Sequence, residues 1–231
     1  MLEKLKETVC SVNLELQKQK LVVYSWGNVS GIDRKAGVVA IKPSGVSYDA
    51  LTPEKIVLVD LQGNVVEGDL RPSSDTLTHL ELYRNFPDIG GVCHTHSTYA
   101  TMWAQACQAI PPLGTTGADY FHGEVPVTGS LTDSEIGNDY ELNTGKIIVK
   151  TFNRLRIDPV YMPGVLVARH GPFTWGADCQ KAIENAMVLE FTAKLAFGAV
   201  ILNPDIKPMR KPLSDKHFFR KHGKNAYYGQ K

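Results

Sequence analysis

The stretch KIVLVDLQGNVVEG (residues 55–68) decides the fold class of this chain. Two apolar runs rich in valine and isoleucine flank the pair Gly63-Asn64, and such a pair is typical of the tight turn between two antiparallel strands. The stretch therefore predicts a β-hairpin. Because a hairpin pairs its strands antiparallel, we expect the sheet of this protein to be mainly antiparallel.

Other segments are expected to add strands to this sheet. Their apolar residues are bounded by glycine, proline or serine, which is typical of strands that end in turns. The expected strands are 21–25 (LVVYS), 37–45 (GVVAIKPSG), the segment that holds His94 and His96, 146–152 (KIIVKTF) and 164–170 (GVLVARH). Residues 26–33 (WGNVSGID) are expected to form a turn.

Helices are expected between and around the strands. The first is predicted by apolar residues at steps of three and four positions, namely Leu2, Leu5, Val9, Val12 and Leu16. Further helices are expected after Ser74 or Asp75, up to about residue 107, over about 179–200 and over 213–222. The sequence therefore predicts a single α/β domain over residues 1–231, with a central, mainly antiparallel sheet flanked by helices.

The composition of the 231 residues limits the classes of function. Apolar residues make up 43% and charged residues 21%, which is ordinary for a soluble globular protein. The net charge of +1 argues against a dedicated nucleic-acid binder. The first residues are charged and the longest apolar run is far shorter than a membrane span, so neither a signal peptide nor a membrane partner is expected. Four scattered cysteines without a C-x-x-C pair indicate a cytoplasmic protein without disulfides.

Two histidines separated by one residue, His94 and His96, lie in a segment that reads as a strand followed by a helix (GGVCHTHSTYATMWAQA, 90–106). Side chains at i and i+2 of a strand point to the same face, so both imidazoles could bind one ion. His170 is the best third ligand, because it follows a β-rich run and precedes a turn. Three neutral imidazoles leave a coordination position open for a substrate, which is typical of catalytic zinc. Asp75 is a candidate fourth ligand or proton carrier, and a helix N-cap is its alternative role.

Three short turns contain groups suited to an anion. Small residues let backbone N–H groups approach phosphate oxygens, hydroxyl groups add donors, and a lysine supplies positive charge. The turns hold Asn28 in WGNVS, then Lys42, Ser44 and Gly45 in KPSG, and Ser73 and Ser74 in PSSD. Each turn lies just after an expected strand or just before an expected helix. Together they predict a phosphorylated small molecule as the ligand.

Several motifs are similar to those of the L-ribulose-5-phosphate 4-epimerases, which belong to the class II aldolase/adducin superfamily. The motifs are WGNVS, IKPSG, PSSDT-TH, HTHS, GTT-ADYF, HGPF-WG and the final KH--RKHG-NAYYGQ. The resemblance runs from the first expected helix to the last residues, essentially the whole chain. It implies a class II aldolase-like fold and a metal-dependent interconversion of L-ribulose 5-phosphate and D-xylulose 5-phosphate at C4, by retro-aldol cleavage and re-addition.

The resemblance also assigns roles to residues of this sequence. It implies one Zn²⁺ per chain, with Mn²⁺ or Co²⁺ as alternatives, and its ligands are His94, His96 and His170, with Asp75 in the same metal site. Contacts to the phosphorylated ketopentose fall on Gly27, Asn28, Lys42, Ser44, Gly45, Ser73 and Ser74. The acid/base pair that moves protons on and off the C4 oxygen becomes Asp119 and Tyr228. Candidate accessory residues are Thr115, Glu141 and His217.

The resemblance further implies a homotetramer with cyclic four-fold symmetry and active sites between subunits. The C-terminal tail, about residues 213–231, is then expected to dock on a neighbouring subunit, where Tyr228 and His217 complete the site. The tail is dense in aromatic residues, which is unusual for a free terminus. On this basis Asp119 and Tyr228 are expected to face each other across the bound substrate fragment, from different chains.

Three positions depart from the pattern of this family. Gly117 stands where a histidine is usual, Thr98-Tyr99 stands where Arg-His is common, and His122 stands where an aromatic residue is usual. The Gly117 change removes a polar side chain and gives more backbone freedom to the segment that carries Asp119. We expect the Gly117 change to affect rate and substrate preference more than reaction type.

Two alternative functions are open at this point. A class II aldolase of the L-fuculose 1-phosphate type would split a related ketose phosphate and release both fragments, but such enzymes have Glu where this chain has Asp75. A non-catalytic interaction module, as in adducin, would keep the fold without the chemistry. For the epimerase, the expected metabolic context is arabinose or ascorbate catabolism, both of which use this step.

Overall fold

The hairpin predicted at residues 55–68 is confirmed by the computed structural model, which describes residues 2–228. Strands β3 (Val57–Asp60) and β4 (Val65–Glu67) pair antiparallel around a turn in which Gly63 has a φ of 95°. Only glycine adopts this φ without strain. The Asp60 carboxylate closes the turn by accepting hydrogen bonds from the backbone N–H groups of Gln62 and Asn64.

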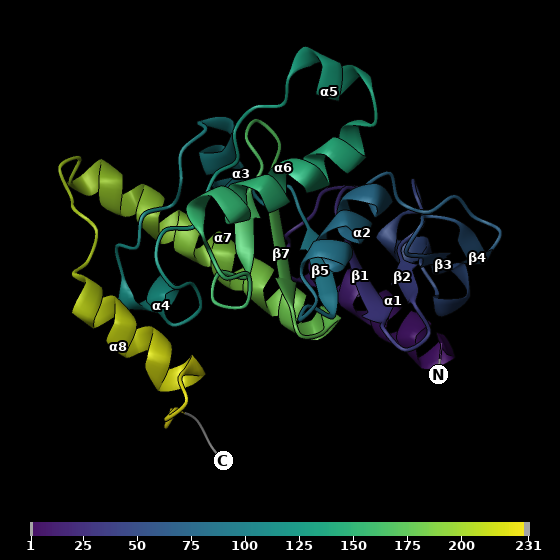
Figure 1. Ribbon diagram of the computed structural model, residues 1–231, viewed down its shortest axis with the longest axis horizontal. Helices are drawn as coiled ribbons and strands as arrows, with labels where there is room; N and C mark the ends of the chain where they lie inside the picture. The colour runs from purple at the N-terminus through teal and green to yellow at the C-terminus, as the bar shows by residue number, and fades with distance from the viewer. Residues whose placement is uncertain (1, 229–231) are drawn as a thin grey trace.

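The hairpin forms one edge of a seven-stranded sheet with the order β4-β3-β2-β1-β5-β7-β6 (Figure 1). Every neighbouring pair of strands is antiparallel, as the hairpin predicts. The other strands are β1 (Asn28–Asp33), β2 (Val38–Ile41), β5 (Gly91–His94), β6 (Gly164–Leu166) and β7 (Pro172–Gly176). The strands expected near 37–45 and 164–170 are therefore confirmed, although each is shorter than expected.

Helices cover both faces of the sheet, because side chains alternate along each strand. On one face, Val39 and Val59 pack in a core that includes the helices α2 (Thr76–Asn85) and α6 (Tyr140–Leu155). On the other, Ala40 and Leu58 pack with α1 (Leu2–Lys18) and the start of α7 (Cys179–Leu202). The remaining helical elements are α3 (Thr98–Gln105), α4 (Thr115–Ala118), α5 (Asp133–Gly137), α8 (Lys211–His222) and the 3₁₀ turns η1 (Tyr48–Ala50) and η2 (Pro53–Lys55).

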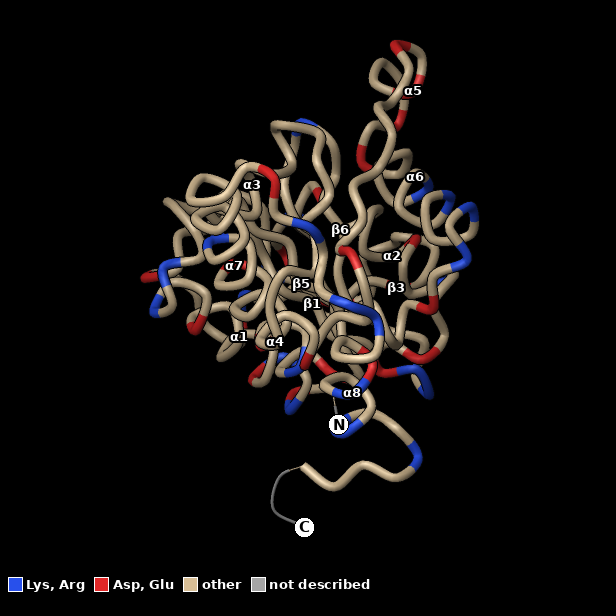
Figure 2. The backbone as a smooth tube through the Cα atoms, turned by 90° about the vertical axis from the view of Figure 1, so that its left-hand side faces the viewer, with Lys and Arg blue, Asp and Glu red and all other residues tan. Residues whose placement is uncertain are grey.

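Two helices differ from the rest in how they pack. Helix α7 is long and apolar enough, by length and composition alone, to cross a membrane, a property that core helices of globular proteins share. Its first half packs on the sheet through Ala182, Ile183 and Ala186. Helix α5 projects away from the body of the molecule (Figure 2). The expected tail, 213–231, corresponds to α8 and the residues after it, of which 229–231 lie outside the described residues.

Residues 146–152, expected as a strand, belong to α6 instead, so this prediction was wrong. The buried residues of α6 lie on one face at helical spacing: Thr144, Gly145, Ile148, Thr151 and Phe152. A short run of branched apolar residues is compatible with either a strand or a buried helix. Packing against α2 decides for the helix.

The segment before the hairpin also differs from expectation. Residues 21–25, expected as a strand, contain a turn in which Tyr24 has a φ of 52°. Residues 26–33, expected as a turn, contain β1, the central strand. The buried side chains of β1 include polar ones, and the Ser30 hydroxyl lies 2.8 Å from both His79 Nδ1 and Tyr83 Oη. These internal hydrogen bonds replace the apolar alternation that normally marks a strand.

Candidate metal centre and substrate pocket

Three imidazoles meet at the end of β5. His94 is the last residue of this strand, His96 lies beyond it, and His170 lies in the turn between β6 and β7. The expectation that one strand holds both His94 and His96 was wrong in this detail. The ring centroids of the three residues lie 4.7, 4.9 and 5.0 Å apart. One ring nitrogen of each lies within 4.8 Å of the others, so the predicted triad forms a possible metal site.

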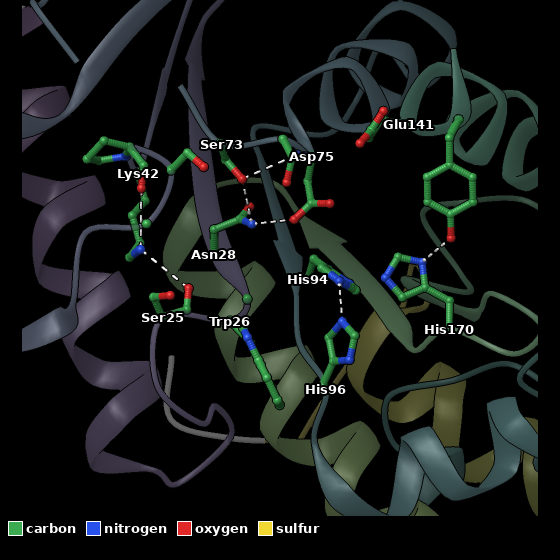
Figure 3. A pocket seen from close by; sticks show the side chains of 16 residues that line it. Ser25, Trp26, Asn28, Lys42, Ser73, Asp75, His94, His96, Glu141 and His170 are labelled. Carbon is green, nitrogen blue, oxygen red and sulfur yellow. Dashed lines mark hydrogen bonds between the residues drawn. The ribbon is translucent and has the colours of Figure 1, made fainter. Parts of the chain in front are cut away.

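The hydrogen bonds of His94 leave the correct nitrogen free for a metal. His94 Nδ1 lies 3.0 Å from the carbonyl oxygen of Pro172, which can only accept, so Nδ1 carries the proton. His94 Nε2 therefore presents its lone pair, and it lies 3.1 Å from His96 Nε2 (Figure 3). His170 Nδ1 lies 3.3 Å from the Tyr140 hydroxyl. Backbone and hydroxyl partners of this kind orient metal ligands, so the three residues fit a divalent cation.

Two of the imidazoles, those of His96 and His170, are held in the neutral form that binds metals. Burial, followed by the neighbouring His94 and His96, lowers the pKa of His170 to about 3. Burial also lowers the pKa of His96, with His94 as the next cause. A protonated imidazole has no lone pair to offer. The site is therefore ready for a cation at neutral pH without first losing protons from these two rings.

Asp75 lies at the start of α2 in the same pocket. Its Oδ2 accepts a hydrogen bond of 2.7 Å from Asn28 Nδ2, and its side chain does not cap the helix. Burial raises the pKa of Asp75, but His94, His79 and the Asn28 amide outweigh that effect and leave the pKa below its usual value. The carboxylate is therefore ionised beside the three histidines. Its role as a fourth ligand stays a prediction.

A cavity of about 520 Å³ joins the histidines to the three predicted anion-binding turns. Asp75, the three histidines and the accessory residue Glu141 line this cavity. So does every predicted substrate-binding residue, namely Gly27, Asn28, Lys42, Ser44, Gly45, Ser73 and Ser74. Residues far apart in the sequence thus form one pocket with a metal-ligand end and a turn-rich end (Figure 3).

Lys42 gives the turn-rich end its charge. It is only 2% exposed, and its Nζ donates to the carbonyl oxygens of Ser25 and Pro43 at 3.5 and 3.4 Å. No carboxylate among residues 2–228 forms an ion pair with it. Burial lowers its pKa to about 8. A buried cation without a counter-ion is costly, and a bound phosphate would remove that cost.

The other predicted site residues lie outside this cavity, on or beside α4 and α8. The Asp119 carboxylate accepts hydrogen bonds from Arg220 at 3.0 and 3.1 Å and lies 3.0 Å from His217 Nδ1. The Tyr228 ring lies 4.6 Å from the Arg220 guanidinium carbon. Thr115 begins α4. Within one chain, Asp119, His217 and Tyr228 therefore form a single cluster, which we call the α4–α8 cluster.

Two cations of α8 beside this cluster, Arg220 and Lys221, keep Asp119 charged. Burial raises the pKa of Asp119, but the hydrogen bonds from His217 and Arg220 and the charge of Lys221 outweigh it and lower the pKa. Lys221 Nζ lies 3.3 Å from Asp119 Oδ2 and 4.7 Å from the centre of the Tyr228 ring. A carboxylate and a phenol thus share the same two cations.

The sequence-profile comparison decides the family. The family described as Class II Aldolase and Adducin N-terminal domain matches residues 7–197. The chain belongs to this family.

Relatives within the class II aldolase and adducin family include a full-length match. The L-ribulose-5-phosphate 4-epimerase UlaF of Salmonella paratyphi C is 53% identical over 230 residues, which cover 100% of both chains, and UlaF of Salmonella choleraesuis gives the same values. Among solved structures, an L-fuculose 1-phosphate aldolase superposes with a TM-score of 0.78 at 25% identity, covering 93% of this chain and 94% of that chain. The predicted class II aldolase-like fold is confirmed.

The three departures from the epimerase pattern have partners inside this chain. A Cβ at Gly117 would lie 2.8 Å from Thr192 Cγ2 on α7, so a histidine there would require this contact to open. Tyr99 packs on Phe197 of α7, with ring centroids 5.8 Å apart. His122 Nε2 lies 2.9 Å from Asp215 Oδ1 of α8. All three departures lie in contacts between elements and outside the class II aldolase pocket described above.

Sequence reasoning missed four residues that line the pocket: Ser25, Trp26, Pro43 and Tyr140. Trp26 and Tyr140 are the aromatic ones, and they lie next to His96 and His170 respectively. Trp26 directly precedes the predicted Gly27, so its position in the WGNVS motif was the available signal. Tyr140 had no such signal, because the start of α6 was not predicted.

Proposed function

We propose that this protein is an L-ribulose-5-phosphate 4-epimerase that interconverts L-ribulose 5-phosphate and D-xylulose 5-phosphate. The observation that carries the proposal is the 53% identity to an epimerase of that name over the full length of both chains. The pocket supports it, because one cavity holds three metal-ligating histidines and a buried lysine suited to phosphate. Carbohydrate breakdown through arabinose or ascorbate is the corresponding metabolic context.

In the proposed reaction, the C4 hydroxyl gives its proton to a base and the C3–C4 bond breaks. The electron pair of that bond stays on the three-carbon fragment, and the other product is glycolaldehyde phosphate. After the aldehyde turns, the electron pair re-forms the bond on its opposite face, and the C4 oxygen regains a proton. A divalent ion, which we propose to be zinc from its nitrogen ligands, supplies the Lewis acid that stabilises negative charge on the three-carbon fragment.

The residues of the pocket divide the substrate between two anchors. His94, His96 and His170 would hold the ion at one end. Lys42 and the small residues of the three turns would bind the phosphate at the other end, where Lys42 supplies charge and the serine hydroxyl groups supply hydrogen bonds. The aldehyde fragment remains bound through its phosphate while its carbonyl end turns. Binding energy from the remote phosphate is thus used at the reacting carbon.

The acid/base pair implied by the resemblance, Asp119 and Tyr228, does not line the pocket of its own chain, and we propose that a neighbouring chain supplies it. Asp119 is ionised and suits a base, and the hydroxyl of Tyr228 suits an acid. The sequence-based expectation was that the two come from different chains, but within one chain both contact Arg220. A chain that lends Tyr228 to its neighbour would therefore lend Asp119 with it. His217, bonded to Asp119, would orient the carboxylate.

The second half of α7 supports assembly into an oligomer. Its apolar side chains Phe191, Leu195 and Ile201 are all about half-exposed or more. Exposed apolar side chains along one helix indicate a contact surface, and head-to-tail contacts that close form cyclic oligomers. We propose the homotetramer with cyclic symmetry on this basis, with each pocket completed by the next chain.

The direct test is incubation of the purified, metal-loaded protein with L-ribulose 5-phosphate. We expect D-xylulose 5-phosphate as the main product and an equilibrium mixture from either side. If dihydroxyacetone and glycolaldehyde phosphate accumulate instead, or if L-fuculose 1-phosphate is cleaved faster, the protein is an aldolase. Absence of turnover of both sugars with a fully loaded metal site would support the adducin-like module.

A further inference from the structure

Trp26 lies in the pocket between the two substrate anchors. The residues beside it are Ser25, whose carbonyl oxygen accepts from Lys42, and Gly27, which lines the same cavity. On its other side, the centroid of its ring lies 6.2 Å from that of His96. Figure 3 shows the indole on the side of the pocket between Ser25 and His96. Trp26 thus forms one wall of the cavity that joins Lys42 to the histidines.

The backbone that carries Trp26 is fixed on both sides. The Tyr48 hydroxyl donates to the carbonyl oxygens of Trp26 and Gly27, at 3.0 and 2.9 Å. The Trp26 N–H donates to the carbonyl oxygen of Val23 at 3.1 Å. Gly27 has a φ of 79°, and a Cβ there would lie 2.8 Å from the carbonyl oxygen of His94. The backbone of Trp26 is therefore fixed beside the pocket by a turn with little room to move.

The side chain of Trp26 differs in chemistry from most of the residues that line this pocket. The other lining residues are mostly polar, whereas the Trp26 side chain is apolar and the residue is 56% exposed. Ligand pockets combine polar groups that orient the ligand with apolar walls that exclude water from it. An indole has a large apolar face and little conformational freedom, so it serves as such a wall.

We propose that Trp26 retains the aldehyde fragment after the C3–C4 bond breaks, and so determines whether the site re-forms that bond or releases both fragments. The inference rests on the proposed epimerase function. An epimerase must keep glycolaldehyde phosphate in place while the carbonyl end turns, although the covalent link to the three-carbon fragment is gone. The phosphate is held by Lys42 and the turns, and the Trp26 ring closes the side of the pocket along the two carbons that turn.

The test compares Trp26→Ala and Trp26→Phe with the metal-loaded wild type, using L-ribulose 5-phosphate as substrate. Two products are measured in each reaction: D-xylulose 5-phosphate, and free glycolaldehyde phosphate trapped as a hydrazone. We expect Trp26→Ala to raise the ratio of released fragment to epimerised product at least tenfold, and Trp26→Phe to keep the ratio near that of the wild type. The control is Val23→Ala, a half-exposed position of the same loop whose side chain does not line the cavity.

A second measurement follows binding without turnover. Glycolaldehyde phosphate added alone should change the indole emission of the wild type but not that of Trp26→Phe, which keeps Trp103 and Trp175. Metal content of one per chain in all variants shows that the histidine site is intact. If the product ratio of Trp26→Ala equals that of an active wild type, Trp26 has no retaining role and the epimerase function stands. If the wild type forms no D-xylulose 5-phosphate, the proposed function itself is wrong.

Discussion

Lys42 keeps a positive charge among backbone carbonyl oxygens and the Tyr48 ring, and burial brings its pKa down to about 8. Only the ammonium form attracts phosphate, so this attraction is present below the pKa and is lost as pH rises through it. We expect KM for L-ribulose 5-phosphate to rise from about pH 8 upward, approaching about tenfold per pH unit. Steady-state kinetics between about pH 7 and pH 9.5 measure this.

The matched variant for this prediction is Lys42→Arg. A guanidinium stays charged throughout the range, so its KM should not rise with pH, whatever its absolute value. Unphosphorylated L-ribulose should be a poor substrate for the wild type at every pH, because it lacks the group that Lys42 binds. A wild-type KM that stays constant up to about pH 9.5 would contradict phosphate binding by the Lys42 ammonium group. Equal turnover of phosphorylated and unphosphorylated L-ribulose would contradict it as well.

Substitution of His96 tests the metal centre. Replacing His96 with Asn removes one of three nitrogen ligands, so bound Zn²⁺ after dialysis should fall well below one per chain. Chelation should abolish wild-type activity and Zn²⁺ should restore it. The control is His122→Asn, because His122 pairs with Asp215 and does not line the cavity that holds the three histidines. Full metal occupancy in His96→Asn, measured by elemental analysis, would remove His96 from the site.

At the scale of elements, the packing of α6 on α2 depends on Gly145. An alanine inside a helix is normally about 1 kcal/mol more favourable than glycine. Here the added Cβ would lie 2.6 Å from Glu81 Cβ and 3.1 Å from the Thr78 carbonyl oxygen, so the two helices must separate. Because such overpacking costs about 1–3 kcal/mol, we expect Gly145→Ala to lower the free energy of unfolding.

The control for this prediction is Gly137→Ala in α5, where an added Cβ meets nothing within 4 Å. That variant should be neutral or more stable by up to about 1 kcal/mol. Thermal unfolding of the two variants and the wild type gives the comparison, with a shift of about 2–4 °C in Tm per kcal/mol for a chain of this size. If both alanines shift Tm equally, helix propensity and not the α2–α6 contact sets the effect.

The elements that sequence predicted well are those whose local pattern and tertiary role agree. The hairpin at 55–68 has both an apolar pattern and a glycine turn, and α1 has one apolar face. The failures occur where partners outside the segment decide. Strand β1 is central although its buried side chains include Asn28 and Ser30, because α2 supplies their hydrogen bonds. No local pattern contains those partners.

The same distinction applies to the site. The histidine triad and the three turns that line the other end of the cavity were predictable, since each is a short motif whose residue types indicate a ligand. Trp26 and Tyr140 were not, because their importance comes from lying beside His96 and His170 in space. The sequence singled out Asp119, His217 and Tyr228 individually, but it did not predict that they lie together within one chain. The ion pairs that join Asp119 to α8 appear only in the folded chain.

At the scale of the whole molecule, the α4–α8 cluster changes which chains should complement each other. Suppose that one chain supplies the histidine pocket and the next supplies both Asp119 and Tyr228. Then His96→Asn chains have a damaged pocket and an intact α4–α8 cluster, whereas Tyr228→Phe chains have an intact pocket and a damaged cluster. Mixed tetramers contain junctions at which a Tyr228→Phe chain contributes an intact pocket and a His96→Asn chain contributes an intact α4–α8 cluster. Random mixing makes about a quarter of the junctions complete.

The mixture of Asp119→Asn with Tyr228→Phe chains should behave differently. Every junction then receives its α4–α8 cluster from a chain that lacks one of the two groups, and loss of one proton-transfer group costs a factor of about 10² to 10⁴. We therefore expect recovered activity in the His96/Tyr228 mixture and none in the Asp119/Tyr228 mixture, with exchange of subunits verified by mass-tagged chains. Recovery in the second mixture would mean that Asp119 and Tyr228 reach a site from different chains. No recovery in either mixture, despite verified exchange, would place the complete site within one chain and would require α8 to move from its contact with α4.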